Sequence, residues 1–213
     1  MSEKITILGV AGSLRKASCN RAALLPVLLM AALCLLQATA TRVEVNAYPA
    51  TEDNFKVTTV FLIRHAEKAD APREDPPLNE SGRLRSQALA RILGQSGIKA
   101  IYTSQYQRTI QTAEPLAKQL GITATSLPLK MSQSNPREVS EQSIKQITGK
   151  IYERTGEAVL VIGHSNTIPE VIKMLGGDNV PKIDEQKFDD LFVVTVFARG
   201  KAKVVHLKYE AGS

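Results

Sequence analysis

Short apolar runs alternate with stretches of helical periodicity between residues 57 and 210, and this alternation constrains the fold of the chain more than any other feature. The runs at 58–63 and 158–162 are apolar almost without interruption, as expected of strands that are covered on both faces of a sheet. Such strands, alternating with helices, are typical of α/β proteins. The sequence therefore predicts a three-layer α/β/α fold around a mixed, mostly parallel sheet.

The pattern also predicts where the individual elements lie. Helical spacing of Leu84, Ala88, Leu89 and Ile92 marks the first helix. Pro115 falls inside the second helix and argues against its continuity. The expected strands are 58–63, 100–103, 122–127 and 158–162 with a terminal hairpin of 191–197 and 201–209, and the expected helices are 80–93, 109–120, part of 136–152 and 167–175.

Length, charge and cysteine content exclude several classes of protein. A chain of 213 residues is long enough for one well-buried domain. Half of the net charge of +6 comes from the first 40 residues, so the domain lacks the basic surface of a nucleic-acid-binding protein. Cys19 and Cys34 both precede the domain, which excludes a disulfide framework or a cysteine metal site within it.

The first 40 residues have the composition of a targeting segment. No charged residue occurs from 22 to 40, and Arg15, Lys16 and Arg21 precede this run. Small residues at Ala38 and Ala40 predict a signal peptide cleaved after Ala40, with residues 41–56 as a linker and 57–210 as the domain. We therefore expect a secreted or periplasmic protein that meets a membrane only through its N-terminal segment. An uncleaved membrane anchor and a buried core helix are the alternatives.

Two of the three histidines directly follow predicted strands. His65 follows Arg64 at the end of the run 58–63, and His164 follows Gly163 at the end of 158–162. A third strand ends shortly before Arg108. Because the carboxyl ends of parallel strands meet at one edge of the sheet, these side chains are expected to converge there.

The segment Arg64-His65-Ala66-Glu67-Lys68 resembles the Arg-His-Gly or Arg-His-Ala motif of the histidine phosphatases, also called the phosphoglycerate mutase-like superfamily. Further features follow in the order of that family, and the resemblance covers roughly residues 57–210. They are residues 77–82, then 102–104 leading to 108–112, then 163–165.

This resemblance implies metal-independent hydrolysis of phosphomonoesters through a phosphohistidine at His65, with no cofactor. A neutral imidazole can attack phosphorus near neutral pH. Arg64 and Arg108 can hold the phosphoryl oxygens with planar, permanently charged guanidinium groups. The family assigns His164 to the same oxygens, and Ser165 is a further phosphate-binding candidate. The expected partner is a phosphorylated small molecule or a phosphoprotein.

The residue that protonates the leaving oxygen is not fixed by the sequence. Many members of the family carry a carboxylate in the segment after the Arg108 helix and its following strand, where Glu138 and Glu141 are the nearest candidates. Glu67 is a third candidate, although it can instead pair with Lys68 or Arg73. His206 lies on a predicted terminal strand without a motif and is expected to be structural.

Two other functions remain open. The first is a binding protein that holds a phosphorylated ligand without turnover. The second is a flavin reductase fragment fused to the phosphatase domain, because the opening residues resemble the first loop of NADPH-dependent FMN reductases. In that family the turn would cradle a flavin phosphate through Gly12, Ser13, Arg15, Ser18 and Asn20. The signal-like run begins where the first helix of such a domain should continue, so no flavin is expected.

Overall fold

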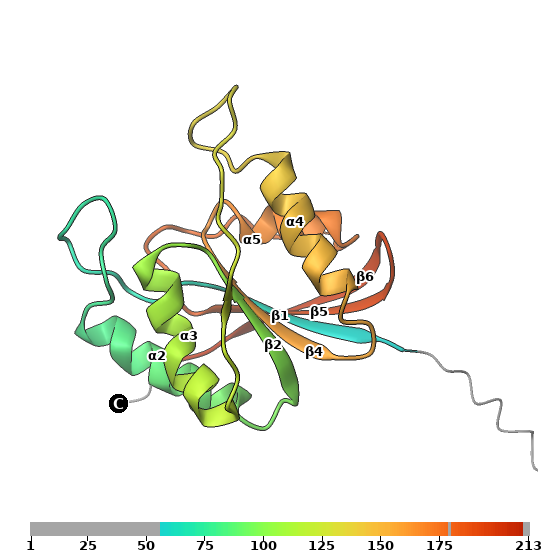
Figure 1. Cartoon of the computed structure of the whole chain (residues 1–213), viewed down its shortest axis with the longest axis horizontal. Coiled ribbons are helices and arrows are strands. Elements are labelled where there is room, and N and C mark those ends of the chain that lie inside the picture. Colours follow the sequence, from blue (N-terminus) through green and yellow to red (C-terminus); the bar gives the residue numbers. More distant parts are fainter. Residues whose placement is uncertain (1–55, 179, 211–213) are drawn as a thin grey trace, which may run out of the picture. The chain divides into compact units, whose positions relative to one another are not determined.

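A six-stranded mixed sheet with the strand order β3-β2-β4-β1-β5-β6 organises the domain (Figure 1). The structure is a computed structural model and describes residues 56–178 and 180–210. The strands are β1 (Thr58–Arg64), β2 (Ile98–Thr103), β3 (Thr125–Ser126), β4 (Ala158–Gly163), β5 (Asp190–Ala198) and β6 (Lys201–Lys208). The helices are α2 (Glu80–Leu93), α3 (Gln107–Leu120), α4 (Glu141–Tyr152) and α5 (Ile168–Met174).

The parallel part of the sheet brings three strand ends to one edge. Strand β4 lies between β1 and β2 and is parallel to both, with Arg64 opposite Gly163 and Thr103 opposite Ile162. Strands β5 and β6 continue the sheet in antiparallel fashion beyond β1. The residues that follow the three parallel strands therefore leave the sheet side by side.

Helices cover both faces of the sheet, as the near-continuous apolar strands require. Helices α2 and α3 lie on one face and α4 and α5 on the other (Figure 1). Strand β1 contributes to both cores, because Val60 and Leu62 pack with α4 and α5 whereas Ile63 packs with α2 and α3. The predicted three-layer α/β/α fold is confirmed.

Helix α2 has the predicted bounds, but two of the four residues expected on its buried face are exposed. Leu84 is 46% exposed and Ile92 is 48% exposed. Ala88 and Leu89 are buried as predicted, and the buried face also includes Gly82 and Ser86. Small residues permit close packing at this face, and a pattern based on large apolar residues could not reveal it.

Other element boundaries also differ from the predicted ones. The strand predicted at 122–127 is reduced to β3, which has only two residues. Helix α4 begins later than the apolar pattern, because the Ser140 side chain accepts a hydrogen bond from the Ser143 N–H and caps the helix there. Helix α3 continues through Pro115 and ends at Gly121, whose φ of 65° forms a left-handed cap.

The predictions for residues 1–55 lie outside the described residues. They include the signal peptide, the linker, both cysteines and the flavin-like turn. None of the helices in the described part of the chain has the length and apolar character needed to cross a membrane.

Candidate active site

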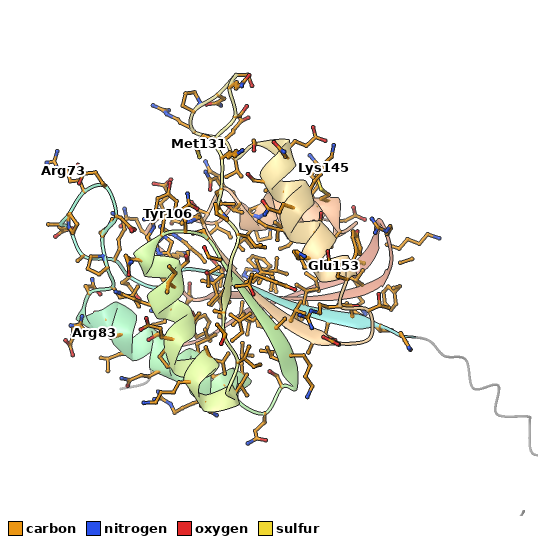
Figure 2. The ribbon with its side chains drawn as sticks, in the orientation of Figure 1. Arg73, Arg83, Tyr106, Met131, Lys145 and Glu153 are labelled. Atoms are coloured by element: carbon orange, nitrogen blue, oxygen red, sulfur yellow. The ribbon has the colours of Figure 1, made fainter. Side chains whose placement is uncertain are left out.

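The ends of β1 and β4 open into a cavity of about 330 Å³. All five predicted site residues line it, namely Arg64, His65, Arg108, His164 and Ser165. The remaining lining residues are Lys68, Tyr106, Leu129, Met131, Arg137, Val139, Asn166 and Glu185. Tyr106, at the start of α3, and Met131, between β3 and α4, are labelled in Figure 2. The expected convergence of two histidines and two arginines is thus observed.

His65 is held with one ring nitrogen available for attack. Its side chain is almost completely buried, and Nδ1 lies 2.7 Å from the Ala66 carbonyl oxygen. A carbonyl only accepts, so Nδ1 carries the proton and Nε2 keeps its lone pair. Burial is the main cause that lowers the pKa of His65 to about 3; the hydrogen bond to Ala66 acts in the opposite direction, and the neighbouring cations Arg64, Arg108 and Lys68 also lower the pKa. The imidazole is therefore a neutral base at physiological pH.

His164 lies beside His65 and is oriented by β2. The two ring centroids are 5.3 Å apart. His164 Nε2 is 3.0 Å from the Ser104 hydroxyl oxygen, which in turn lies 2.9 Å from the Thr109 hydroxyl oxygen. Burial lowers the pKa of His164 to about 2, with additional contributions from His65, Arg108 and Arg64. Both imidazoles are thus uncharged while the cavity is lined by permanent cations.

Arg64 joins the cavity to the segment that precedes β5. Its Nη1 donates to the carbonyl oxygens of Asp184 at 3.0 Å and Lys187 at 3.1 Å. The guanidinium carbon lies 4.3 Å from the centre of the Phe188 ring. Nε of Arg64 is buried and has no hydrogen-bond partner among the described residues, so an anion oxygen can supply the missing acceptor. Burial lowers the pKa of Arg64, but a guanidinium remains charged at physiological pH.

Arg108 is placed by the first turn of α3. Its guanidinium carbon lies 4.3 Å from the centre of the Tyr106 ring, and its Nη1 is 3.8 Å from Oδ1 of Asp75. The same Asp75 oxygen accepts a hydrogen bond of 2.9 Å from the Gln107 N–H. The loop before α2 is thereby attached to the start of α3, next to the cavity.

Three charged lining residues were not among the predicted site residues. Lys68 belongs to the motif that contains His65, so its position in the sequence was a usable signal. Arg137 lies in the segment before α4, and its carbonyl oxygen accepts a hydrogen bond of 3.0 Å from Asn166 Nδ2. Glu185 lies in the connection between α5 and β5, where the sequence has no motif. Figure 1 shows the segment before α4 projecting away from the sheet.

None of the three candidate acids from the sequence lines this cavity. Glu67 pairs with Arg85 at 2.7 Å rather than with Lys68 or Arg73, and it is held by the Arg85 Nε as well. Glu138 accepts a hydrogen bond from Asn135, and Glu141 pairs with Lys145. The sequence motifs do not indicate Glu185, because this residue is far from them in the sequence and only the folded chain places it at the cavity.

Glu138 and Glu141 line an adjoining cavity of about 690 Å³ instead. It shares Val139, Ser165 and Asn166 with the first cavity. The space next to the predicted phosphate site is therefore large enough for an organic group of considerable size.

His206 has a structural position, as expected. It lies 2.6 Å from Asp190 and stacks on the Phe192 ring, away from the residues that line the cavity. Within residues 56–178 and 180–210, no group of three or more His, Cys, Asp or Glu side chains is arranged to hold a metal ion.

The fold and this site define an α/β protein with a cationic cavity at the carboxyl ends of its parallel strands. The family model of the histidine phosphatase superfamily (branch 1) matches residues 60–131, which include His65 and Arg108. This match and the shared fold confirm the predicted resemblance to the histidine phosphatase superfamily. No curated protein matches the sequence.

Solved structures of several phosphatases share this fold. The protein histidine phosphatase SixA, determined with tungstate, is 22% identical with a TM-score of 0.56, covering 70% of this chain and 96% of that protein. A putative phosphohistidine phosphatase SixA from Nakamurella multipartitia is 20% identical with a TM-score of 0.51. The match covers 73% of this chain and 98% of that protein. A mycobacterial glucosyl-3-phosphoglycerate phosphatase is 14% identical with a TM-score of 0.52. The match covers 74% of this chain and 100% of that protein.

Proposed function

We propose that this protein is a metal-independent phosphomonoester hydrolase that acts through a phosphohistidine at His65. The observation that carries the proposal is the single cavity of about 330 Å³ in which a neutral His65 meets Arg64, Arg108 and His164. The superfamily match and the phosphatases among the structural neighbours support it.

The polarity of the cavity suits an in-line attack on phosphorus. Nδ1 of His65 is occupied by the Ala66 carbonyl, so Nε2 is the nucleophile. Arg64 and Arg108 supply the charge that stabilises the equatorial oxygens in the transition state. His164, held by Ser104, is a further donor to these oxygens once it binds a proton. Water then attacks the phosphohistidine and releases inorganic phosphate.

Hydrolysis is favoured over mutase activity by the absence of a large insertion between Arg108 and His164. A mutase has to retain its product for a second phosphoryl transfer. A site without such an insertion is more open and releases the product more readily. The substrate class includes phosphorylated small molecules and phosphoproteins. The structural neighbours include a protein histidine phosphatase and a sugar-phosphate phosphatase, so both classes belong in a substrate screen. Export through the N-terminal segment is a separate proposal, which cell fractionation would test.

The decisive experiment compares the full chain with its His65→Ala variant on an aryl phosphate in the presence of EDTA. Turnover is expected in the wild type and a loss of at least about 10³-fold in the variant, because the nucleophile is absent. An acid-labile phosphoenzyme should form only in the wild type. Equal low rates in both proteins, with retained tungstate binding, would identify a phospho-ligand binding protein instead.

Metal independence and flavin content can be checked on the same sample. Activity that survives EDTA and does not rise with added Mg²⁺ or Zn²⁺ supports the metal-independent reaction. A yellow protein with flavin absorbance would revive the fused reductase alternative.

A further inference from the structure

Among the described residues that line the cavity, Glu185 is the only carboxylate. The other charged lining residues are cations, namely Arg64, Lys68, Arg108 and Arg137. Cations can hold the phosphoryl group, but they cannot act as proton acceptors at neutral pH. Glu185 is therefore the one acidic side chain in this cavity that can exchange a proton with a leaving group or a water molecule.

The segment that carries Glu185 is fixed by the phosphate site itself. Nη1 of Arg64 donates to the carbonyl oxygens of Asp184 and Lys187, which lie on either side of Glu185 in the sequence. The turn closes on itself through a hydrogen bond of 3.0 Å from the Lys187 N–H to the Asp184 carbonyl. The backbone that positions Glu185 is thus attached to a residue that lines the phosphate cavity.

Two neighbouring contacts strengthen this attachment. Oδ1 of Asp184 accepts a hydrogen bond of 2.9 Å from the Gln186 N–H, so this carboxylate is used within the turn. Phe188 packs against both Arg64 and His65, with ring centroids 5.9 Å apart in the second case. The turn is therefore seated directly against the predicted nucleophile.

We propose that Glu185 is the general acid and base of the hydrolysis, an inference that rests on the phosphatase function proposed above. The three carboxylates suggested by the sequence do not reach this cavity, since Glu67 is paired with Arg85 and Glu138 and Glu141 line the adjoining cavity. Glu185 replaces them as the proton donor.

Glu185 alone can donate and take back the proton that the two steps of the reaction require. In the first step the His65 Nε2 lone pair forms the N–P bond, the P–O bond to the leaving group breaks, and the departing oxygen takes the proton of the Glu185 carboxylic acid. In the second step a water oxygen forms a new P–O bond while the Glu185 carboxylate takes one water proton. The N–P bond breaks, its electron pair returns to His65, and inorganic phosphate leaves. Glu185 is again protonated.

The test is a leaving-group series on full-length wild type and Glu185→Gln. An alkyl phosphate requires protonation of its leaving oxygen, whereas 2,4-dinitrophenolate leaves without a proton. Glu185→Gln should lower kcat/KM for the alkyl phosphate by about 100-fold and for the dinitrophenyl ester by less than about 5-fold, since general acid catalysis typically contributes 10²–10⁴-fold. The second step also loses its base, so the variant should accumulate phosphohistidine after a burst of dinitrophenolate.

Glu138→Gln and Glu141→Gln are the matched controls. Both remove a carboxylate near the site, yet neither residue lines the phosphate cavity, so wild-type leaving-group dependence is expected. Tungstate binding and the melting temperature of each variant report whether the fold is retained. Glu185 is exposed, so its substitution should not unfold the domain.

Three outcomes overturn the proposal. If Glu185→Gln had the wild-type kcat/KM for both esters, this carboxylate would take no part in the reaction. Equal losses for both leaving groups would indicate a role in binding rather than proton transfer, and a larger effect in Glu138→Gln or Glu141→Gln would reassign the acid. Failure of the proposed function is distinguishable, because the wild type would then form neither product nor phosphoenzyme.

Discussion

The imidazole rings of His65 and His164 meet edge to face, with their centroids 5.3 Å apart and their planes at 62°. Neither ring has a carboxylate as a hydrogen-bond partner among the described residues; His65 contacts a backbone carbonyl and His164 a serine hydroxyl. Because Arg64 and Arg108 stand beside both rings, protonating either ring would add a further positive charge to a cavity that is already lined by cations. The cavity therefore holds both histidines in the neutral form.

This arrangement predicts an unusual titration of the free protein. With pKa values lowered to about 3 and about 2, the C–H resonances of His65 and His164 should not shift between pH 8 and pH 5 in NMR spectra. Assignment by His65→Asn and His164→Asn identifies the two signals. A midpoint near 6.5 for either ring would contradict the burial and the charge repulsion described here.

Burial of His65 also predicts how stability depends on pH. The folded-state pKa is lowered below the unfolded value of 6.5, so between these values the unfolded chain binds a proton that the folded chain does not. The free energy of unfolding should therefore fall as the pH decreases from 7 to 5, by about 2 kcal/mol from this residue. Urea denaturation at pH 5, 6 and 7 measures the slope, and His65→Asn should reduce it by about half, because the lowered pKa of His164 contributes in the same direction. An equally steep slope in the variant would show that other groups are responsible.

Gly82 packs closely against the backbone that follows His65. A Cβ at this position would lie 2.1 Å from the Glu67 carbonyl oxygen, so the segment after His65 would have to move. Gly82→Ala should destabilise the domain by about 1–3 kcal/mol and reduce activity as well. Gly149→Ala is the control, because this helical glycine has no atom within 4 Å of its added Cβ and should gain up to about 1 kcal/mol. Thermal melts and the aryl phosphatase assay distinguish the two; a stable, active Gly82→Ala would contradict the close approach.

The sequence predicted the elements that are defined by strong periodicity. Strands β1 and β4 lie where the apolar pattern placed them, because burial on both faces of the sheet leaves a clear signal, and helix α2 has the predicted bounds. The positions of His65 and His164 at one edge of the sheet were predicted in the same way, because each residue directly follows a parallel strand. Weakly patterned segments were predicted less well, as the two-residue strand β3 shows.

The acidic residue of the cavity could not be predicted for a physical reason. Glu185 belongs to a connection without periodicity, and its place at the site depends on hydrogen bonds from Arg64 to two backbone carbonyls. Backbone acceptors leave no trace in the side-chain sequence. Glu138 and Glu141 were candidates because many members of the resembled family carry a carboxylate in that segment, but these two residues line the adjoining cavity.

Arg64 and Arg108 should respond differently to replacement by lysine. Both variants lose a planar guanidinium, so kcat/KM for the dinitrophenyl ester should fall by about 10²-fold or more in each. Arg64→Lys additionally loses the two hydrogen bonds that fix the turn of Glu185, whereas Arg108 makes no hydrogen bond to that turn among the described residues. The alkyl phosphate should therefore lose about 10-fold more than the dinitrophenyl ester in Arg64→Lys, and both esters should lose equally in Arg108→Lys. Parallel kcat/KM measurements on the two esters decide the matter. If Arg64→Lys affected both esters to the same extent, the link between the phosphate-binding arginine and the proton donor would be wrong, even if Glu185 itself proved to be the acid.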